Sequence, residues 1–418
     1  KISKQCRFEF TLKKYHCAKY RTEDGKLPSS GYELLRQLSY DGLQQRYHIT
    51  PKTFPINYNV LHQRLQYELE VIGNLNFCDY FLICRDIINF AHRQGYWHVG
   101  RGSAANSLVS YCLGLTEVDP IRYHLYFERF LNYARGSPPD IDLDFSWRHR
   151  DAVLRYIYER YGEDKVAMMS SVHTLHARGA LREVAKAFGV SEKELDTFRK
   201  FIPHTHADNL NHLQQKYPEA RDLRMDSELY QKILRTASRL EGFPNYSGIH
   251  SSGVVITEQP ITHFSALERS ANGFVKTQLD MYSGEDTGLI KFDILAVRGL
   301  GTLEDACRNI EAHGHEPVDL FHWPKIFSDE KAQTLMRSGK TIGVVHAESP
   351  FIRNALRITQ AQSFELLYII LGMVRTGCVE SGMMYTFIER LLHPEKRKEA
   401  HQALVEILPE TFGVMIFE

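Results

Sequence analysis

Three aspartates alternate with apolar residues in the stretch Ser137–Phe145, which reads SPPDIDLDF. Its two adjacent prolines disfavour a helix, and alternate side chains of a β-strand point to one face, so we expect Asp140, Asp142 and Asp144 to share a face. Three like charges on one strand face are unfavourable unless a cation lies among them, and Mg²⁺ is a hard cation that carboxylates bind. The stretch therefore predicts a magnesium site; the alternative is an acidic edge strand that faces solvent.

A second expected strand, Gly288–Leu295, carries one aspartate and one lysine among apolar residues. Lys291 and Asp293 are two positions apart and so share a face, where a lone buried charge is costly. Either the two residues neutralise each other, or Asp293 faces the acidic strand while Lys291 faces phosphate. An Asp-x-Asp pair joined by a third aspartate from a neighbouring strand supplies the ligands of two-metal nucleotidyl transfer.

The segment Gly100-Arg-Gly-Ser103 lies between an expected short strand and an expected helix. Glycines let the backbone come close to a ligand, free N–H groups at a helix N-terminus favour an anion, and Arg101 adds positive charge. We interpret Arg101, Gly102 and Ser103 as a triphosphate cradle, although a tight strand-to-helix turn would need the same residue types.

Five further basic residues are candidates for binding anions. Arg129 and Arg135 precede the acidic stretch and are interpreted either as triphosphate ligands or as ion-pair partners. Arg178, Arg182 and Lys186 recur every four residues and would share one helix face. That face is either solvated or follows a nucleic-acid backbone.

Several histidines lie close together in the following region: His173, His176, His204, His206 and His212. Their His-x-His and His-x-x-His spacings suit a metal. The sequence around them is loop-like, however, and offers no matching cysteine or carboxylate frame, so the pattern disfavours zinc.

Composition sets the broad class of protein. The 418 residues exceed one ordinary domain, and 51 basic against 51 acidic residues leave no global charge that indicates nucleic acid, although a local groove stays open. Seven cysteines without a CxxC pair indicate a reduced, cytoplasmic protein. No apolar run approaches the roughly 18 residues of a membrane span, so no membrane is expected. A first residue that is not Met, and a last stretch that reads as an interrupted strand, indicate an internal fragment.

Taken together, these motifs resemble the bacterial DNA polymerase III alpha family, the C-family of replicative polymerases. The resemblance covers essentially the whole chain and is carried by the segments Gly100–Leu108, Phe127–Asn132, Pro139–Phe145, His250–Ile256, Thr277–Asp280, Leu289–Leu295 and Glu348–Pro350. It implies an α+β fold, with a polymerase beta-type nucleotidyltransferase palm on a mixed sheet, a helical thumb insertion and partial helical fingers. The implied bounds are an exit segment of a phosphoesterase-type domain with its linker at 1–57, palm at 58–168 and 245–300, thumb at 169–244 and fingers at 301–418.

The resemblance further implies a bacterial, template-directed DNA polymerase. It would transfer dNMP from a dNTP to the 3′ end of a primer, with release of pyrophosphate, in replication or error-prone repair synthesis. Asp140, Asp142 and Asp293 match the family's catalytic metal ligands and would hold two Mg²⁺ ions, with Mn²⁺ as a substitute, whereas Asp144 is left to local hydrogen bonding. The residues implied at the triphosphate are Arg101, Gly102, Ser103 and Lys291.

Three positions depart from the family pattern. Val99 lies where a proline is usual, Asn106 lies where glycine is common, and Thr376 replaces the proline of an Arg-Pro-Gly motif. These changes leave the metal ligands intact and bear on rate and fidelity. The tract Glu380–Met384 leans towards the error-prone branch.

Two other functions are weighed against the polymerase. The altered cradle and the altered Arg-x-Gly motif are the support for a non-catalytic DNA-binding relic. A nucleotidyltransferase that copies no template is disfavoured by an insertion of thumb length. The sliding clamp and other replisome subunits are expected to bind regions past Glu418, where most of the fingers would also lie, so the chain alone is expected to lack part of what activity requires.

Overall fold

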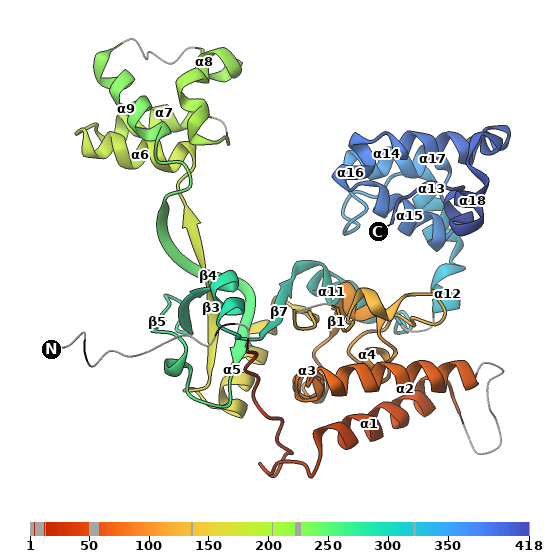
Figure 1. Ribbon diagram of the computed structural model, residues 1–418. Helices are drawn as coiled ribbons and strands as arrows, with labels where there is room; N and C mark the ends of the chain where they lie inside the picture. Colours follow the sequence, from red (N-terminus) through yellow and green to blue (C-terminus); the bar gives the residue numbers. More distant parts are fainter. Residues whose placement is uncertain are drawn as a thin grey trace. The chain divides into compact units, whose positions relative to one another are not determined.

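The computed structural model describes residues 4, 12, 14–49, 58–134, 137–202, 204–221, 227–320 and 323–417. The chain forms two compact units, Lys1–Gly301 and Thr302–Glu418. The expected α+β class with a mixed sheet and many helices is confirmed (Figure 1).

The larger unit is built on a sheet whose described strands run in the order β1-β2-β7-β4-β3-β6-β5. The strands are β1 His98–Arg101, β2 Asp142–Ser146, β3 Val166–Thr174, β4 Pro244–Ile256, β5 Leu267–Arg269, β6 Val275–Asp280 and β7 Lys291–Val297. The β2–β7 and β3–β6 pairs are parallel and the other neighbours are antiparallel. The two strands that carry the predicted aspartates are therefore direct neighbours.

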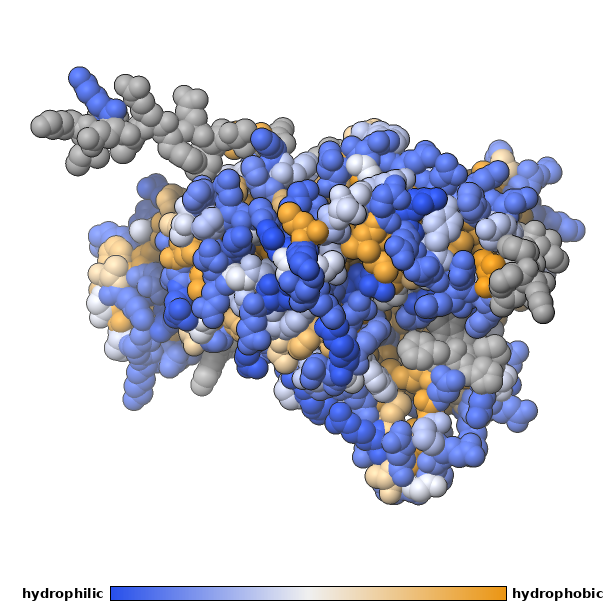
Figure 2. All heavy atoms as spheres, turned by 90° about the horizontal axis from the view of Figure 1, so that it is seen from below, coloured by the Kyte–Doolittle hydropathy of each residue, from blue (hydrophilic) through white to orange (hydrophobic). Residues whose placement is uncertain are grey.

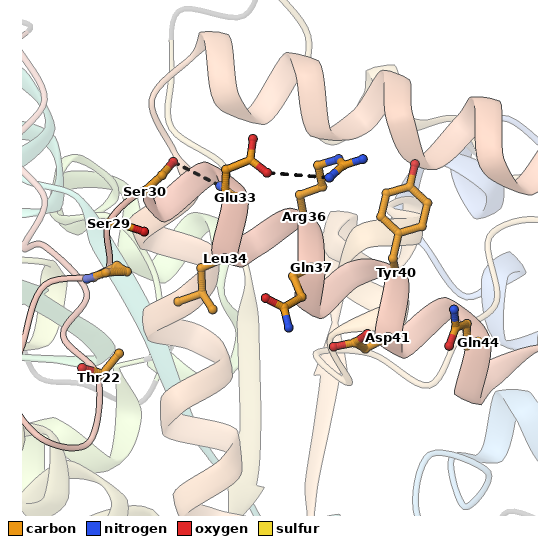
Figure 3. A pocket seen from close by; sticks show the side chains of 11 residues that line it. Thr22, Ser29, Ser30, Glu33, Leu34, Arg36, Gln37, Tyr40, Asp41 and Gln44 are labelled. Atoms are coloured by element: carbon orange, nitrogen blue, oxygen red, sulfur yellow. Dashed lines mark hydrogen bonds and ion pairs between the residues drawn. The ribbon is translucent and has the colours of Figure 1, made fainter.

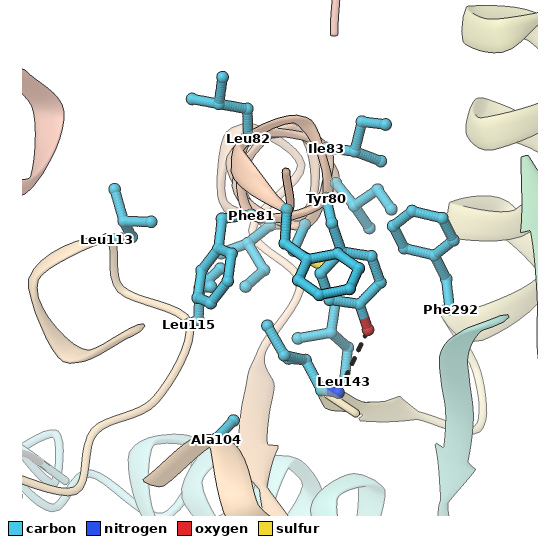
Figure 4. Close-up of a cluster of buried hydrophobic side chains, with 14 of the residues drawn as sticks. Tyr80, Phe81, Leu82, Ile83, Ala104, Leu113, Leu115, Leu143 and Phe292 are labelled. Atoms are coloured by element: carbon cyan, nitrogen blue, oxygen red, sulfur yellow. Dashed lines mark hydrogen bonds between the residues drawn. The ribbon is translucent and has the colours of Figure 1, made fainter. Parts of the chain in front are cut away.

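One face of β2 and β7 is covered by helix α3, Cys78–Arg93. The alternation in the acidic stretch places Leu143 and Phe145 in this core, each at most 1% exposed. Tyr80 and Phe81 of α3 pack above them, and the ring of Phe292 from β7 completes the cluster (Figure 4). The apolar side of each strand thus anchors it, while the acidic side faces away from the core.

Other helices of this unit surround the same core. They are α1 Gly31–Arg46, α2 Tyr58–Asn74, α4 Leu108–Cys112 and α5 Arg150–Tyr161, with the 3₁₀ segments η2 Gly102–Asn106 and η3 Phe127–Arg129. Met281 of α10, Met281–Asp286, packs instead against a separate small cluster that includes Met169 of β3 and Val255 of β4. Residues of α1, α2, α3 and α5 share one continuous buried cluster with β2 and β7.

Residues 175–243, here called the helical insertion, lie between the end of β3 and the start of β4 (Figure 1). The insertion contains α6 Ala177–Ala187, α7 Glu192–Phe201, α8 Leu213–Lys216 and α9 Glu228–Ser238, together with the 3₁₀ segment η4 Ala207–His212. Its buried residues, among them Leu181, Leu210 and Ile233, form a cluster separate from that of the sheet. The insertion therefore has its own hydrophobic core.

The smaller unit is helical in its described part. Its helices are α12 Trp323–Phe327, α13 Glu330–Ser338, α14 Pro350–Thr359, α15 Phe364–Met373, α16 Thr376–Glu380, α17 Met383–Leu392 and α18 Gln402–Ile407; α11, Arg298–Ala312, begins in the larger unit and ends in this one. The interrupted strand expected at the end of the sequence is wrong: Pro409–Thr411 is a 3₁₀ turn, and residues 412–417 form no strand. Phe412 takes a left-handed backbone conformation there, with φ +55°, which an extended strand excludes.

None of the described helices combines the length and the apolar character that crossing a membrane requires. The face of the molecule drawn in Figure 2 is mostly hydrophilic, with hydrophobic side chains in small separate groups.

Candidate active site

The three aspartates that the sequence singled out come together across β2 and β7. Asp142 and Asp293 are paired in the parallel register of these strands, and Asp140 lies two residues before Asp142 on the same face. One carboxylate oxygen from each residue lies within 4.8 Å of the others. We call these three residues the acidic cluster; the fold gathers them because two neighbouring strands present the same face.

The acidic cluster crowds negative charge into a half-buried place. Burial and the neighbouring carboxylates of Asp293 and Asp142 raise the pKa of Asp140 to about 6, although Lys291 opposes the shift. Burial also raises the pKa of Asp142, against the opposing charge of Arg101. For Asp293 the effect of burial is outweighed, because hydrogen bonds from Lys291 and Ser252 lower the pKa of this carboxyl. Crowded, oxygen-only ligands of this kind fit a divalent hard cation such as Mg²⁺.

Lys291 and Asp293 form a direct ion pair, with Lys291 Nζ also 3.6 Å from Asp140 Oδ1. The structure thus contains the neutralising pair, and Asp293 also faces the acidic strand, as the other interpretation expected. Ser252 on β4 adds a hydrogen bond of 2.6 Å from its hydroxyl to Asp293 Oδ1. The phosphate-binding role of Lys291 stays a prediction.

The predicted cradle residues lie directly against the acidic strand. Arg101 pairs with Asp142 in the antiparallel register of β1 and β2. Gly102 has φ +77°, a conformation that favours glycine, and a Cβ at this position would lie in tight contact with Asp142 Oδ2, at 3.0 Å. Ser103 Oγ lies 3.4 Å from the carbonyl oxygen of Asp140, to which it donates. The strand-to-helix turn and the acidic cluster are thus one local structure.

Asp144 lies outside the acidic cluster and holds Arg101 instead. Arg101 Nε donates to Asp144 Oδ2 at 2.7 Å, and an Nη of the same guanidinium is 3.4 Å from Asp142 Oδ2. Asp144 is 6% exposed, and its other oxygen, Oδ1, has no hydrogen-bond partner among the described residues. The buried carboxylate therefore fixes the guanidinium beside Asp142.

Of the remaining basic candidates, Arg178, Arg182 and Lys186 make their described side-chain contacts within the helical insertion. Arg129 is exposed at the end of η3, and Arg135 lies outside the described residues. Arg178 Nε donates to the carbonyl of Ile202 at 2.7 Å. Arg182 and Lys186 both contact Glu192 Oε1, at 3.5 and 2.8 Å, so the predicted basic face of α6 is partly neutralised within the helical insertion.

Tyr80 is a residue near the site that the sequence patterns missed. Its hydroxyl accepts a 3.2 Å hydrogen bond from the backbone N–H of Ile141, between Asp140 and Asp142. Its ring stacks on Phe292, between Lys291 and Asp293, with centroids 4.6 Å apart (Figure 4). Burial raises its pKa well above the ordinary value, so the hydroxyl stays neutral. The sequence did offer one signal. Tyr80 lies among the apolar residues of an expected core helix, and a buried tyrosine hydroxyl needs a hydrogen-bond partner.

A pocket of about 270 Å³ opens beside Asp140 and Lys291. Its other lining residues are Ser137, Pro138, Pro139, Met169, Met281, Glu285 and Leu289. Thioether and aliphatic side chains line this pocket together with the charged groups of Asp140, Glu285 and Lys291, so it suits a ligand with both apolar and polar parts.

Another pocket runs along the outer face of α1 and contains none of the predicted site residues (Figure 3). Ser30 caps the helix by accepting from the backbone N–H of Glu33, and the Glu33 carboxylate lies 3.6 Å from an Nη of Arg36. Both interactions stabilise the first turns of α1, and we assign this pocket no catalytic role.

Two family models cover most of the chain. The bacterial DNA polymerase III alpha NTPase domain matches residues 33–296, and the bacterial DNA polymerase III alpha subunit finger domain matches residues 299–418.

Curated relatives match the same residues. The DNA polymerase III subunit alpha of Bacillus subtilis is 36% identical over 418 residues, which is 100% of this chain and 36% of that protein. The error-prone DNA polymerase of Symbiobacterium thermophilum is 34% identical over 100% of this chain and 37% of its own length. The subunit alpha of Thermus aquaticus is 37% identical over 86% of this chain and 30% of its own length. The chain thus spans about a third of the length of these relatives, and it belongs to the bacterial DNA polymerase III alpha family.

Proposed function

We propose that this chain is the catalytic core of a template-directed DNA polymerase that extends a primer 3′ end and releases pyrophosphate. The observation that carries the proposal is the acidic cluster, in which two adjacent strands present three carboxylates within 4.8 Å of one another. A relative named DNA polymerase III subunit alpha and one named error-prone DNA polymerase are similar to this chain to nearly the same degree, 36% and 34% identical. The choice between replication and error-prone repair synthesis therefore stays open.

Asp140, Asp142 and Asp293 are proposed to hold two Mg²⁺ ions, and Mn²⁺ would suit the same oxygen ligands. When bound, such a pair activates the primer hydroxyl and stabilises the charge that develops on the leaving pyrophosphate. The chain's own part is to hold the carboxylates in place: β2 and β7 set their spacing, and Ser252 orients Asp293.

Arg101, Gly102, Ser103 and Lys291 are proposed to bind the triphosphate, with Arg129 and Arg135 as further ligands. Support comes from the position of the first three residues, which lie against the acidic strand at the start of η2. Arg101 is half exposed, so its guanidinium keeps donors for a phosphate while Asp144 holds its Nε. The pocket beside Asp140 is proposed to receive the terminal sugar and base of the primer.

The parts of the fold are proposed to follow the division of the family. Residues 58–168 and 245–300 would form the palm, 169–244 the thumb and 301–418 part of the fingers, with an exit segment at 1–57. The helical insertion between β3 and β4 and the finger-domain match at 299–418 support this division. Primer–template DNA is the proposed partner, with Arg178, Arg182 and Lys186 along its backbone. The sliding clamp and other replisome subunits would bind regions outside this chain.

Primer extension by the full-length protein tests this function. The assay uses a primer on a template of defined sequence, one dNTP at a time, with and without Mg²⁺. We expect extension only with the complementary dNTP and only with metal, its loss in Asp142→Asn, and wild-type extension in Asp41→Asn, which removes an exposed carboxylate of α1. Equal extension by Asp142→Asn would refute the metal ligands. Extension that ignores the template would indicate an untemplated transferase, and no extension by the wild type would indicate a relic.

A further inference from the structure

Three side chains from separate parts of the helical insertion meet at one place. His176 precedes α6, His206 precedes η4, and Glu241 follows α9. The Nδ1 atom of His176 is 2.7 Å from Glu241 Oε1, and the Nδ1 atom of His206 is 2.9 Å from the same oxygen. We call these residues the histidine cluster; it supplies the carboxylate that the histidine spacings alone had lacked.

The ligand set of the histidine cluster is that of a zinc site. Two imidazole nitrogens and one carboxylate oxygen, with Zn–N near 2.0–2.1 Å and Zn–O near 2.0–2.2 Å, lie about 3.3–3.5 Å apart around a tetrahedral ion. The three ligand atoms here lie within 4.8 Å of one another. The side chains of His176 and His206 are 61% and 70% exposed, so both rings can move outward by the roughly 0.4–0.8 Å that separates their hydrogen-bond distances from those around an ion.

Neighbouring groups hold the carboxylate in position. Glu241 Oε2 accepts a hydrogen bond from the backbone N–H of Ala207, which leaves Oε1 directed at the two rings. Fixing a ligand through its second oxygen is typical of metal sites. The two rings pack edge to face, with centroids 5.6 Å apart. In this arrangement the Nδ1 atoms of both rings point at the same carboxylate oxygen.

His204 lies close to the histidine cluster but is already bonded. Its Nε2 accepts from a guanidinium nitrogen of Arg178 at 3.0 Å. A pocket is lined by His176, Arg178, Gly179, His204, Thr205 and His206, and it gives solvent access to the cluster. The fourth ligand position of a tetrahedral ion would therefore be filled by water.

We propose that His176, His206 and Glu241 form a zinc site that joins the starts of α6 and η4 to the end of α9. The folded insertion would bind this ion and the unfolded chain would not, so ion binding would stabilise the folded insertion. The inference is independent of polymerase activity, because it concerns other residues and another metal. The competing account is a hydrogen-bonded bridge in which Glu241 serves only as an acceptor for Ala207 and the two imidazoles.

Zinc binding by the full-length protein distinguishes these accounts. Metal is removed by chelation, Zn²⁺ alone is added in equilibrium dialysis, and the bound zinc per chain is counted for wild type, His206→Gln, Glu241→Gln and the control His212→Gln. His212 is exposed at the end of η4 in the same insertion and lies outside the cluster. We expect each cluster variant to bind one equivalent fewer than wild type and the control to match wild type. Zinc at the acidic cluster adds equally to all four proteins and cancels in the comparison.

The thermal unfolding midpoint provides a second measurement. Added Zn²⁺ is expected to raise the midpoint of the insertion's transition in wild type and in His212→Gln, and to leave it unchanged in the cluster variants. Should His206→Gln fail to fold by circular dichroism, His176→Gln removes a different ligand and carries the same expectation. An equal zinc count in wild type and in the folded cluster variants would overturn the site, as would an equal loss in the control.

Discussion

The acidic cluster and the histidine cluster bring similar numbers of ligands together in opposite ways. Asp140, Asp142 and Asp293 repel one another, and they are held close because β2 and β7 are hydrogen-bonded neighbours over a buried core. In the histidine cluster, two exposed imidazoles donate to one carboxylate, so the side chains attract one another. A site assembled against repulsion needs support from the surrounding fold, whereas a site assembled by attraction contributes to that fold.

That support is visible around the acidic cluster. Tyr80 accepts a hydrogen bond from the backbone of Ile141, next to Asp140 and Asp142, and stacks on Phe292, next to Asp293. One side chain of α3 therefore contacts both segments that carry the acidic cluster. Asp144 and Arg101 stabilise the same strand from the side of β1. We expect changes in these supports to lower both activity and stability, and changes in the histidine cluster to lower stability without lowering activity.

Replacement of Asp142 by Asn gives the largest expected effect. Removing one ligand should lower the primer-extension rate by about 10³-fold, because the charge developing in the transition state loses its stabilisation. The free energy of unfolding should change by less than about 1 kcal/mol, because lost repulsion from Asp140 and Asp293 offsets the lost contact with Arg101. Extension assays and urea unfolding measure the two quantities. A large loss of stability would contradict the view that repulsion dominates in this cluster.

The substitution Tyr80→Phe gives the next largest expected effect. The ring and its stacking on Phe292 are kept, while the backbone N–H of Ile141 loses its acceptor. We expect kcat to fall about 10–100-fold, as for other groups that orient a metal ligand, with little change in KM for the dNTP. The free energy of unfolding should fall by about 1–3 kcal/mol. Tyr126→Phe, at a side chain that is 76% exposed, is the matched control and should change neither quantity. Unchanged kcat despite the loss of stability would make Tyr80 purely structural.

Acid should weaken the sheet beside the acidic cluster. Burial, with a smaller effect of His92, lowers the pKa of His98 on β1 to about 4. The unfolded chain binds this proton more readily, so the stabilisation by neutral His98 is complete above its unfolded pKa near 6.5 and is lost as the pH falls towards 4. We expect amide protection in β1 to fall by about 3 kcal/mol over this range, measured by hydrogen exchange corrected for intrinsic rates. His98→Gln should flatten the dependence, and a wild-type profile in that variant would exclude His98 as its source.

The helical insertion should respond to pH in the opposite direction, with the smallest effect. The hydrogen bond with Glu241 raises the pKa of His206. The stabilisation is therefore fully present below the unfolded pKa of histidine and is lost as the pH rises through the higher folded value. In metal-free protein we expect protection of the Ala207 amide to fall slightly between pH 6 and 8. Glu241→Gln should abolish this change, and a rise in wild-type protection with pH would contradict the assigned pair.

Local order along the chain was sufficient to predict several features. The period of two in SPPDIDLDF predicted that Asp140 and Asp142 share a face, because a strand allows no other alternation. The glycines of GRGS predicted a tight strand-to-helix turn, and Gly102 has the positive φ that favours glycine there; the predicted approach of this backbone to a phosphate stays a prediction. The α+β class followed from the family resemblance.

Contacts between distant segments required the folded chain. The parallel register that sets Asp293 beside Asp142, the hydroxyl of Tyr80 beneath Ile141, and the carboxylate of Glu241 between two histidines each join residues far apart in sequence. Residue type and local spacing restrict the secondary structure of a segment, but they do not determine which other segment packs beside it. That choice depends on how the apolar faces of all segments pack into shared cores, which is a property of the whole chain.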